Sequence, residues 1–502
     1  MPQRCTLGVD IGTSSTKGVL VAEDGGILAT ATRAHEVDRP RPGWVEMDAR
    51  IWWDEFTRIA RDLLAAAPSA EVTAVGVSGM GPCVLLVDED DEPVRPAILY
   101  GVDTRSGDQI ARMSHELGAD AITRVGGSML TSQAAGPKIV WIAEEEPDAY
   151  ARARRLFMPA SWLARRLTGA YVLDHQSASQ STPLYDIEAE RWHDAWWERY
   201  AAGLEQPTLR WADEIAGVVT AEAAAVTGIP AGTPVVTGTI DAWTEAVSVG
   251  AHGLGDLMLM YGTTMFLIAT DPRTLRTPSM WTTVGAFPGT RNLAGGLATS
   301  GAVTAWLTDL TDADYPALLA EAAESGVGAR GLVMLPYFAG ERTPLLDPDA
   351  RGVIAGLALS HTRGDLYRAA LEATAMGVRH NIETMRRAGA DIRRIVAVGG
   401  GTQGQLWMQI VSDVTGLVQE VPRITIGAGY GAAFLAARAT ATPAPRIEEW
   451  NPVATTVTPE PDTAAAYDAL FDRYLRLYAS TKDIVHELAG VQRSASAVAV
   501  SA

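Results

Sequence analysis

One pattern occurs twice in this chain of 502 residues and limits the folds open to it. Leu7–Asp10 and Gly18–Ala22 are typical of two strands joined by a turn rich in Gly, Ser and Thr. Leu257–Met260 and Met265–Thr270 repeat this layout around a second Gly/Thr turn. A unit that recurs in the second half of a chain indicates an internal duplication. We therefore expect two related α/β domains with a boundary near residues 250–255.

The hydrophobic periodicity predicts most of the other elements. Alternating or continuous apolar runs predict further strands, and apolar residues three or four apart predict amphipathic helices. The stretch from Ala149 to Leu209, rich in Trp, is expected to hold helices and exposed loops. The predicted strands are Val72–Val77, Val84–Val87 and Arg394–Val398, and the predicted helices are Asp48–Ala67, Asp103–Leu117, Ala242–Val249, Arg363–Arg387, Gln405–Val414, Gly429–Arg438 and Thr463–Leu488.

Composition excludes several classes of partner. The chain carries 60 Asp and Glu against 41 Lys and Arg, a net charge of -19. Such a chain repels nucleic-acid backbones and anionic lipid surfaces, although Mg²⁺ and backbone N–H groups can still hold an anion such as ATP. Cys5 and Cys83 have neither zinc-site nor CxxC spacing. With no signal-peptide core and no apolar run of about 18 residues, a cytoplasmic protein is expected.

The first turn contains residues suited to phosphate binding. The segment Asp10-Ile-Gly-Thr-Ser-Ser-Thr-Lys17 places a carboxylate at a strand end, followed by hydroxyls, backbone N–H groups and a lysine. Such a turn can hold phosphate oxygens while Asp10 holds Mg²⁺, directly or through water. The segment lacks GxxxxGK[ST] and is not a P-loop. A plain hairpin turn is the alternative interpretation.

Two further motifs extend this interpretation. Gly262-Thr263-Thr264 occupies the position of the first turn in the second half, so the two turns together could hold the β- and γ-phosphates. Asp241 follows a short strand and begins a helix, where a carboxylate can accept the proton of an attacking hydroxyl. The alternative for Asp241 is a structural N-cap.

Gly399–Gly404 matches G-x-G-x-x-G after a strand, with Glu420 about twenty residues further on. On its own this pattern indicates a dinucleotide site and an NAD-dependent oxidoreductase. The same glycines would equally suit a bare backbone surface against an adenine and its ribose.

Taken in order, these motifs resemble those of the FGGY carbohydrate kinases of the actin-like/sugar-kinase superfamily. The resemblance extends from Leu7 to about Ala437. It rests on LGVDIGTSSTKGVL, PAILYGVDTRS, GTIDAWTEAVSVG, YGTTMF, LPYFAGERTPLLDPDARGVIAGL, HTRGDLYRAALEATA and VGGGTQGQLWMQIVSDVTG. It implies two ribonuclease-H-like α/β domains with MgATP and a small sugar or polyol in a central cleft between them.

The resemblance also implies domain limits. These are an N-terminal domain at 1–250 and a nucleotide-binding domain at 251–440. A C-terminal helical segment at 441–490 and a disordered tail at 491–502 are expected to follow. The oligomeric state is left open, with a homodimer as the candidate.

Roles follow by position from the family motifs. Asp10 would be the magnesium-associated aspartate and Asp241 the catalytic base. The expected nucleotide contacts are Gly12, Thr13, Ser14, Ser15 and Lys17 in the first loop, Gly262 and Thr263 in the second, and Gly301, Gly400, Gly401 and Gln405. The expected sugar contacts are Met80, Gly81, Pro82, Asp103, Gln133, Asp241 and Phe266.

The departures from the family concern the sugar. Gly81-Pro82 stands where xylulokinases usually carry Met-His and glycerol kinases carry Arg-Glu. Ala242 replaces the Asn or Gln of many relatives, and Tyr100 replaces a frequent Trp. The xylulokinase branch is still the most similar, so conversion of D-xylulose to D-xylulose 5-phosphate is predicted. Alternatives are L-xylulose, ribulose or erythritol as substrate, or a non-catalytic nucleotide- and sugar-binding sensor.

Overall fold

The computed structural model describes residues 3–500, with side chains described up to residue 494. Contacts divide the chain into two compact units, each built from three separate stretches. The first unit holds the described residues up to His252, together with Pro272–Asn292 and Ile424–Pro452. The second holds Gly253–Asp271, Leu293–Arg423 and the described residues from Val453 onward. The domain limits expected from the sequence remain predictions, because these units are defined by contacts alone.

The first unit is built around one large sheet with strand order β13-β14-β5-β1-β2-β3. Strands β1, β2 and β3 are antiparallel neighbours, whereas β5 runs parallel to β1, and both β14 and β15 run parallel to β5. The strands are β1 (Gln3–Ile11), β2 (Ser15–Ala22), β3 (Ile27–Ala34), β5 (Ala70–Gly79), β13 (Ile215–Val218), β14 (Pro234–Val236) and β15 (Thr239–Ile240).

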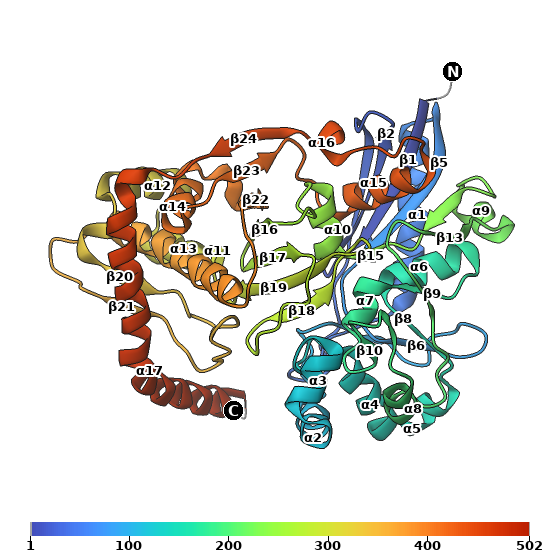
Figure 1. The fold of residues 1–502 in the computed structure, drawn as a ribbon, viewed down its shortest axis with the longest axis horizontal. Coiled ribbons are helices and arrows are strands. Elements are labelled where there is room, and N and C mark those ends of the chain that lie inside the picture. Colours follow the sequence, from blue (N-terminus) through green and yellow to red (C-terminus); the bar gives the residue numbers. More distant parts are fainter. Residues whose placement is uncertain (1–2, 501–502) are drawn as a thin grey trace. The chain divides into compact units, whose positions relative to one another are not determined.

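Helices cover opposite faces of this sheet because neighbouring side chains on a strand point to opposite sides. Val9 and Gly18 face α1 (Ala49–Ala66), where Trp52 and Phe56 are fully buried. Gly8 faces α15 (Ala428–Thr440), which comes from the far end of the chain. Figure 1 shows α15 in red against the blue strands β1, β2 and β5.

Helix α15 approaches the sheet so closely that glycine is required beneath it. A Cβ on Gly76 would lie 1.8 Å from the carbonyl oxygen of Ala432, and one on Gly8 would lie 2.0 Å from that of Gly429. These glycines therefore bring the backbones of helix and sheet into direct contact. Val19, Val21 and Ala74 pack around them against the helix.

The smaller elements of the first unit lie between and after the main strands in sequence. They are β4 (Glu46–Met47), β6 (Leu85–Val87), β7 (Ala97–Ile98), α2 (Gly107–Leu117), α3 (Ala119–Gly126), α4 (Ala135–Glu145), α5 (Pro147–Arg152), β8 (Arg155–Phe157), α6 (Pro159–Thr168), β9 (Val172–Asp174), α7 (His175–Ser179), β10 (Tyr185–Asp186), β11 (Arg191–Trp192), α8 (Asp194–Tyr200), β12 (Thr208–Arg210), α9 (Ala221–Thr227), α10 (Asp241–Ser248), β18 (Trp281–Val284) and α16 (Ile447–Trp450).

The stretch from Ala149 to Leu209 is more regular than the sequence predicts. It contains short strands and helices from α5 to β12, and Trp162, Trp192 and Trp197 are buried in it. Elements of two to ten residues are too short to show a clear hydrophobic period, and for that reason the sequence pattern did not reveal them.

The second unit repeats the central arrangement of the first. Its strands run in the order β19-β17-β16-β22-β23-β24. Strands β16 and β17 form an antiparallel hairpin and β22 runs parallel to β16, as β1, β2 and β5 do in the first unit. The predicted duplication is therefore confirmed. The strands are β16 (Asp256–Tyr261), β17 (Met265–Asp271), β19 (Arg291–Leu297), β22 (Arg394–Val398), β23 (Gln419–Pro422) and β24 (Val453–Val457).

The sequence pattern predicted some helices of the second unit but not the two at Gly301–Thr311 and Tyr315–Ser325. The helix α13 begins at Arg363 and ends at Arg387, as predicted, because Thr362 and Asp365 form a capping box at its start. The others are α11 (Gly301–Thr311), α12 (Tyr315–Ser325), α14 (Gln405–Thr415) and α17 (Ala464–Val500), with a small hairpin of β20 (Val333–Leu335) and β21 (Val353–Ala355). Of the expected tail, residues 491–500 belong to α17, and 501–502 lie outside the described residues.

None of the helices within residues 3–500 is both long and apolar enough to cross a bilayer.

Candidate active site

Three parallel strands of the first unit end at the same edge of the sheet and bring polar groups together there. In the strand register Asp10 of β1 pairs with Ser78 of β5, and Ser78 pairs with Thr239 of β15. Asp241 follows β15 directly. Because parallel strands present their carboxyl ends at one edge, Asp10, Ser78 and Asp241 meet at the place where α/β sheets commonly bind ligands.

Asp241 is the first residue of α10 rather than its N-cap, which is Ile240. Its Oδ1 accepts a hydrogen bond of 2.7 Å from the backbone N–H of Ala242. Burial raises the pKa of the Asp241 carboxyl above its ordinary value, and the Ala242 hydrogen bond opposes this shift. Among the described residues, the other carboxylate oxygen of Asp241 has no hydrogen-bond partner, so the group can accept a proton from a ligand.

Two further carboxylates lie around Asp241. Burial, together with the negative charge of Asp241, raises the pKa of Asp10 and brings the pKa of Glu245 to about 7. Lys17, which pairs with Asp10 across the β1–β2 hairpin, lowers both values. Three half-buried carboxylates beside one lysine favour a bound cation.

The surroundings of Asp10 suit Mg²⁺, which needs few protein ligands, better than a metal ion that protein side chains alone must hold. Asp10 Oδ1 is buried and has no hydrogen-bond partner among the described residues. Within residues 3–500 no three or more His, Cys, Asp and Glu side chains are arranged to hold a metal ion. Magnesium commonly takes one or two carboxylates and completes its shell with water and phosphate oxygens, so Asp10 and its neighbours suit it.

The first Gly/Ser/Thr turn is shorter than its sequence suggests, because β2 already begins at Ser15. The Gly12 N–H donates to the Ser15 carbonyl at 3.0 Å, and Thr13 Oγ1 lies 3.0 Å from the Tyr100 hydroxyl. In the described part of the chain, the N–H groups of Thr13 and Ser14 have no acceptor. Lys17 is exposed two residues after Ser15. The turn thus offers free backbone donors to an anion.

The segment that differs from the family lies directly beneath Asp241. Met80 is buried, and its N–H donates to the Ile11 carbonyl at 2.7 Å. A Cβ on Gly81 would lie 2.6 Å from the side chain of Ile240, the residue before Asp241. Pro82 is buried as well, so among these three predicted sugar contacts Gly81 is the accessible one.

Gln133 and Asp103 are held by the protein itself. Gln133 Oε1 accepts a hydrogen bond from the Gly101 N–H at 3.1 Å. Asp103 is fully buried, accepts from the Val45 N–H at 2.6 Å, and forms an ion pair of 2.7 Å with Arg105. These bonds fix Asp103 in a turn, which explains why the helix predicted from Asp103 begins at Gly107. Direct contact of Asp103 and Gln133 with a sugar remains a prediction.

The second turn, in the second unit, is held by the start of a helix. The Gly301 N–H donates to the Gly262 carbonyl and the Ser300 N–H donates to the Thr263 carbonyl, each at 3.0 Å. A Cβ on Gly301 would lie 2.7 Å from the Gly262 oxygen, so glycine permits this approach. Phe266 lies just after the turn as the second residue of β17 and is half-buried.

The glycine-rich segment after β22 lies at the same edge of this second sheet, because Met260 of β16 and Val398 of β22 are parallel partners. Gly401 packs against Trp407, whereas a Cβ on Gly400 would meet nothing within 4 Å. Gln405 is exposed as the first residue of α14. The open backbone at Gly400 is compatible with a flat ligand ring.

The acidic residue of the dinucleotide pattern is already engaged in the protein. Glu420 forms an ion pair with Arg394, which also binds Asp256 at 2.7 Å. A carboxylate paired in this way is poorly placed to bind a ribose hydroxyl. The interpretation of Gly399–Gly404 as an NAD site therefore lacks a free acidic residue for the ribose, which is the second part of the dinucleotide pattern.

Several residues around the site were missed by sequence reasoning. Glu245 lies one helical turn after Asp241, and that spacing alone could have identified it. Ser78 could be found only once the strand register was known. His35, which follows β3, contacts the first turn, and Glu55 of α1 contacts His35; neither residue gives a signal in the sequence.

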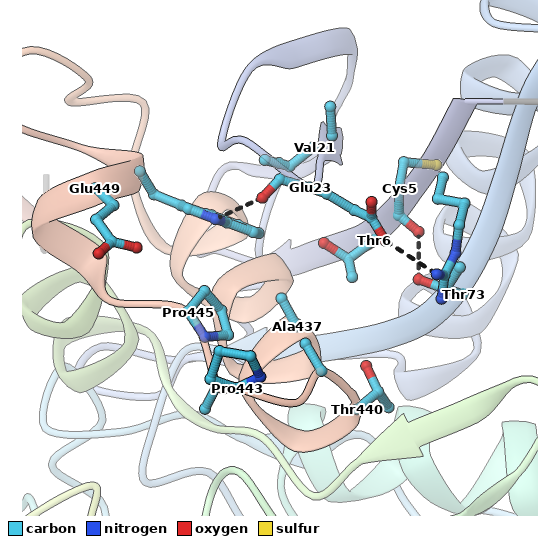
Figure 2. Close-up of a pocket in the computed structure, with 15 residues that line it drawn as sticks. Cys5, Thr6, Val21, Glu23, Thr73, Ala437, Thr440, Pro443, Pro445 and Glu449 are labelled. Carbon is cyan, nitrogen blue, oxygen red and sulfur yellow. Dashed lines mark hydrogen bonds and ion pairs between the residues drawn. The ribbon is translucent and has the colours of Figure 1, made fainter.

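A cavity of about 260 Å³ lies at the opposite edge of the first-unit sheet (Figure 2). It is lined by the beginnings of β1 and β5, the end of β2 and the segment after α15. The Trp450 indole N–H donates to the Glu23 carbonyl there at 3.1 Å. None of the predicted site residues lines this cavity.

Comparison with known proteins adds independent findings. Profiles of the FGGY family of carbohydrate kinases match residues 5–248 (N-terminal domain) and 257–440 (C-terminal domain). The chain is 29% identical over 482 residues to the xylulose kinase of Escherichia coli (strain K12), covering 94% of this chain and 98% of that one. It is also 29% identical over 458 residues to the glycerol kinase of Nocardia farcinica, covering 86% and 90%. The crystal structure of xylulose kinase from Rhodospirillum rubrum is 31% identical, with a TM-score of 0.90, covering 96% and 100%.

Proposed function

Because this chain belongs to the FGGY family of carbohydrate kinases, we propose that it transfers the γ-phosphoryl group of ATP to a terminal hydroxyl of D-xylulose, giving D-xylulose 5-phosphate. The family match confirms the predicted enzyme class, a phosphotransferase with an alcohol group as acceptor. It also confirms the predicted fold class of two α/β domains of the ribonuclease-H-like (actin-like/sugar-kinase) type.

The observation that carries the proposal is the meeting of Asp10, Ser78 and Asp241 at one sheet edge, beside a turn with free N–H groups. A kinase needs a proton acceptor, a cation site and phosphate-binding donors close together. The first unit supplies a candidate for each of them. The choice of xylulose rests on the relatives whose names give that sugar.

In the proposed reaction, Asp241 accepts the proton of the terminal sugar hydroxyl as its oxygen attacks the γ-phosphorus. A new oxygen–phosphorus bond forms while the bond from the γ-phosphorus to the leaving oxygen of ADP breaks. The N–H groups of Thr13 and Ser14, and the turn at Gly262–Thr264, would hold phosphate oxygens through the transfer.

Magnesium, when bound, would neutralise charge on the transferring phosphates. Asp10 would hold this ion directly or through water, and Lys17 would contribute a second positive charge. Requirement for Mg²⁺, like the cytoplasmic location and the homodimer, is part of the proposal.

The test is ADP release with MgATP across D-xylulose, L-xylulose, the ribuloses, erythritol, glycerol and gluconate. Turnover that is highest on D-xylulose and lost in Asp241→Asn would support the proposal. Turnover on another sugar would support the kinase assignment and refute D-xylulose as the substrate. The altered Gly81-Pro82 segment would then explain the different substrate.

If the protein binds ATP and sugar but releases no ADP with any sugar of the panel, it is a sensor instead. Binding of NAD(H) with no response to ATP would overturn the kinase itself.

A further inference from the structure

His35 lies against the first phosphate turn and bonds to it twice. Its ring Nε2 is 3.0 Å from the Gly12 carbonyl oxygen, and its backbone N–H donates to the Ser14 carbonyl at 3.0 Å. We propose that His35 is a positioning residue that aims the N–H groups of this turn at the phosphates of ATP. The proposal rests on the proposed function, because it assigns the turn to ATP.

The peptide geometry connects the ring of His35 to the phosphate donors. The Gly12 carbonyl and the Thr13 N–H belong to one planar trans peptide and therefore point in opposite directions. When His35 holds the carbonyl on its side, the Thr13 N–H is directed away from it, toward the open side of the turn. That N–H is one of the two without an acceptor among the described residues. His35 thus determines the direction of a donor that it does not touch.

The ring itself has little freedom. A carbonyl oxygen can only accept, so Nε2 must carry the proton of its bond to Gly12. Nδ1 lies 2.9 Å from Glu55 Oε2 on α1, and the Thr16 hydroxyl donates to the same oxygen. The His35 side chain is 5% exposed and that of Glu55 11% exposed. The contacts from Glu55 on α1 and from Gly12 hold the imidazole at both nitrogens.

A buried His–Glu–Thr group could also serve stability alone. The two ring nitrogens separate these roles, because Nε2 contacts the phosphate turn and Nδ1 contacts the framework. His35→Asn places an amide nitrogen near the position of Nδ1, so it retains a donor to Glu55 and loses the bond to Gly12. His35→Gln places its amide nitrogen near the position of Nε2, so it retains the bond to Gly12 and loses the one to Glu55.

The experiment compares these two variants with the unaltered protein. We measure KM for ATP, KM for the sugar, kcat, ATP and adenosine affinity by calorimetry, and Tm. His35→Asn should raise KM and Kd for ATP about tenfold, the size expected for one lost hydrogen bond, with adenosine affinity and sugar KM unchanged. His35→Gln should keep a nearly normal KM for ATP and show the larger fall in Tm.

The outcomes distinguish this proposal from the proposed function. If the unaltered protein neither binds ATP nor releases ADP, the function itself fails. If it turns over but His35→Asn keeps the normal KM for ATP, or both variants change KM for ATP and Tm in proportion, His35 is structural and the positioning role is refuted. An ATP affinity that is nearly normal in His35→Gln and weakened in His35→Asn would support the positioning role.

Discussion

At the scale of single residues, Asp241 combines the two properties required of a general base. It is buried enough for its pKa to be raised, which makes it a better proton acceptor than an ordinary carboxylate. We expect Asp241→Asn to lower kcat by about 10²–10⁴ while leaving the KM for sugar within a few-fold, because the amide keeps the size and the hydrogen-bond acceptor. Steady-state ADP release measures this, with the exposed Asp54→Asn as control. Near-normal kcat would exclude Asp241 from base catalysis.

The neighbouring Asp10 predicts a dependence of stability on pH. Its folded pKa is raised above the unfolded value, so between those values the folded state binds more protons than the unfolded state. Stability of the metal-free protein therefore falls as pH rises through this window. Removing the charge should reverse the loss, and we expect Asp10→Asn to be more stable by about 1–2 kcal/mol at pH 8.

The measurement for Asp10 is thermal unfolding in EDTA at pH 5.5 and pH 8. The gain in Tm of Asp10→Asn should shrink at the lower pH, where the native carboxyl is already protonated. Asp54→Asn removes an equal charge from an exposed position and should show no such pH dependence. An equal Tm for Asp10→Asn and the unaltered protein at pH 8 would mean that the charge of Asp10 does not destabilise the fold.

At the scale of elements, the contact between α15 and the sheet depends on glycine. Alanine at Gly76 would place its Cβ 1.8 Å from the Ala432 carbonyl, a backbone atom that cannot rotate away. We expect Gly76→Ala to destabilise the protein by about 1–3 kcal/mol through overpacking. Gly107→Ala is the matched control, since its Cβ meets nothing within 4 Å and it lies in the first turn of α2. Urea unfolding of both variants tests this, and equal midpoints would contradict it.

Elements differed in how well the sequence predicted them. Long amphipathic segments such as Arg363–Arg387 were predicted to the residue, because many turns of a helix display one period and the caps mark its ends. The two hairpins and their turns were predicted from alternation and from Gly and Thr. The short elements between 149 and 209 were not, since each is too short to show a clear hydrophobic period, and Trp162, Trp192 and Trp197 are buried through tertiary contacts.

The candidate site shows the same division. Asp10 lies at the end of a strand, and Asp241 and the two turns follow strands directly, so local sequence identified them. Ser78 reaches the site through strand register, and His35 reaches it through a contact between the residue after β3 and the first turn. Such pairings join residues distant in sequence, and a single chain without its fold contains no sign of them.

At the scale of the whole molecule, the first unit is not contiguous in sequence. Its sheet is covered on one face by α15, which lies after most of the second unit. A fragment ending at residue 252 would leave Val19, Val21 and Ala74 without their covering helix. We expect this fragment to be aggregation-prone or molten, with strong binding of an apolar dye and no cooperative unfolding transition. Circular dichroism and dye binding test this, and a cooperative transition would show that α15 is dispensable.

The late position of α15 in the sequence also delays the completion of the first unit during synthesis. Between residue 252 and the end of α15 at Thr440 the ribosome adds 440 − 252 = 188 residues. At about 5–20 residues per second this takes roughly 10–40 s. During that interval the strands of the first sheet have been synthesised, but the apolar face that α15 covers is still exposed. Until α15 emerges, the side chains of Val19, Val21 and Ala74 stay without the helix that covers them, and an apolar surface of this kind is what holdase chaperones bind in general.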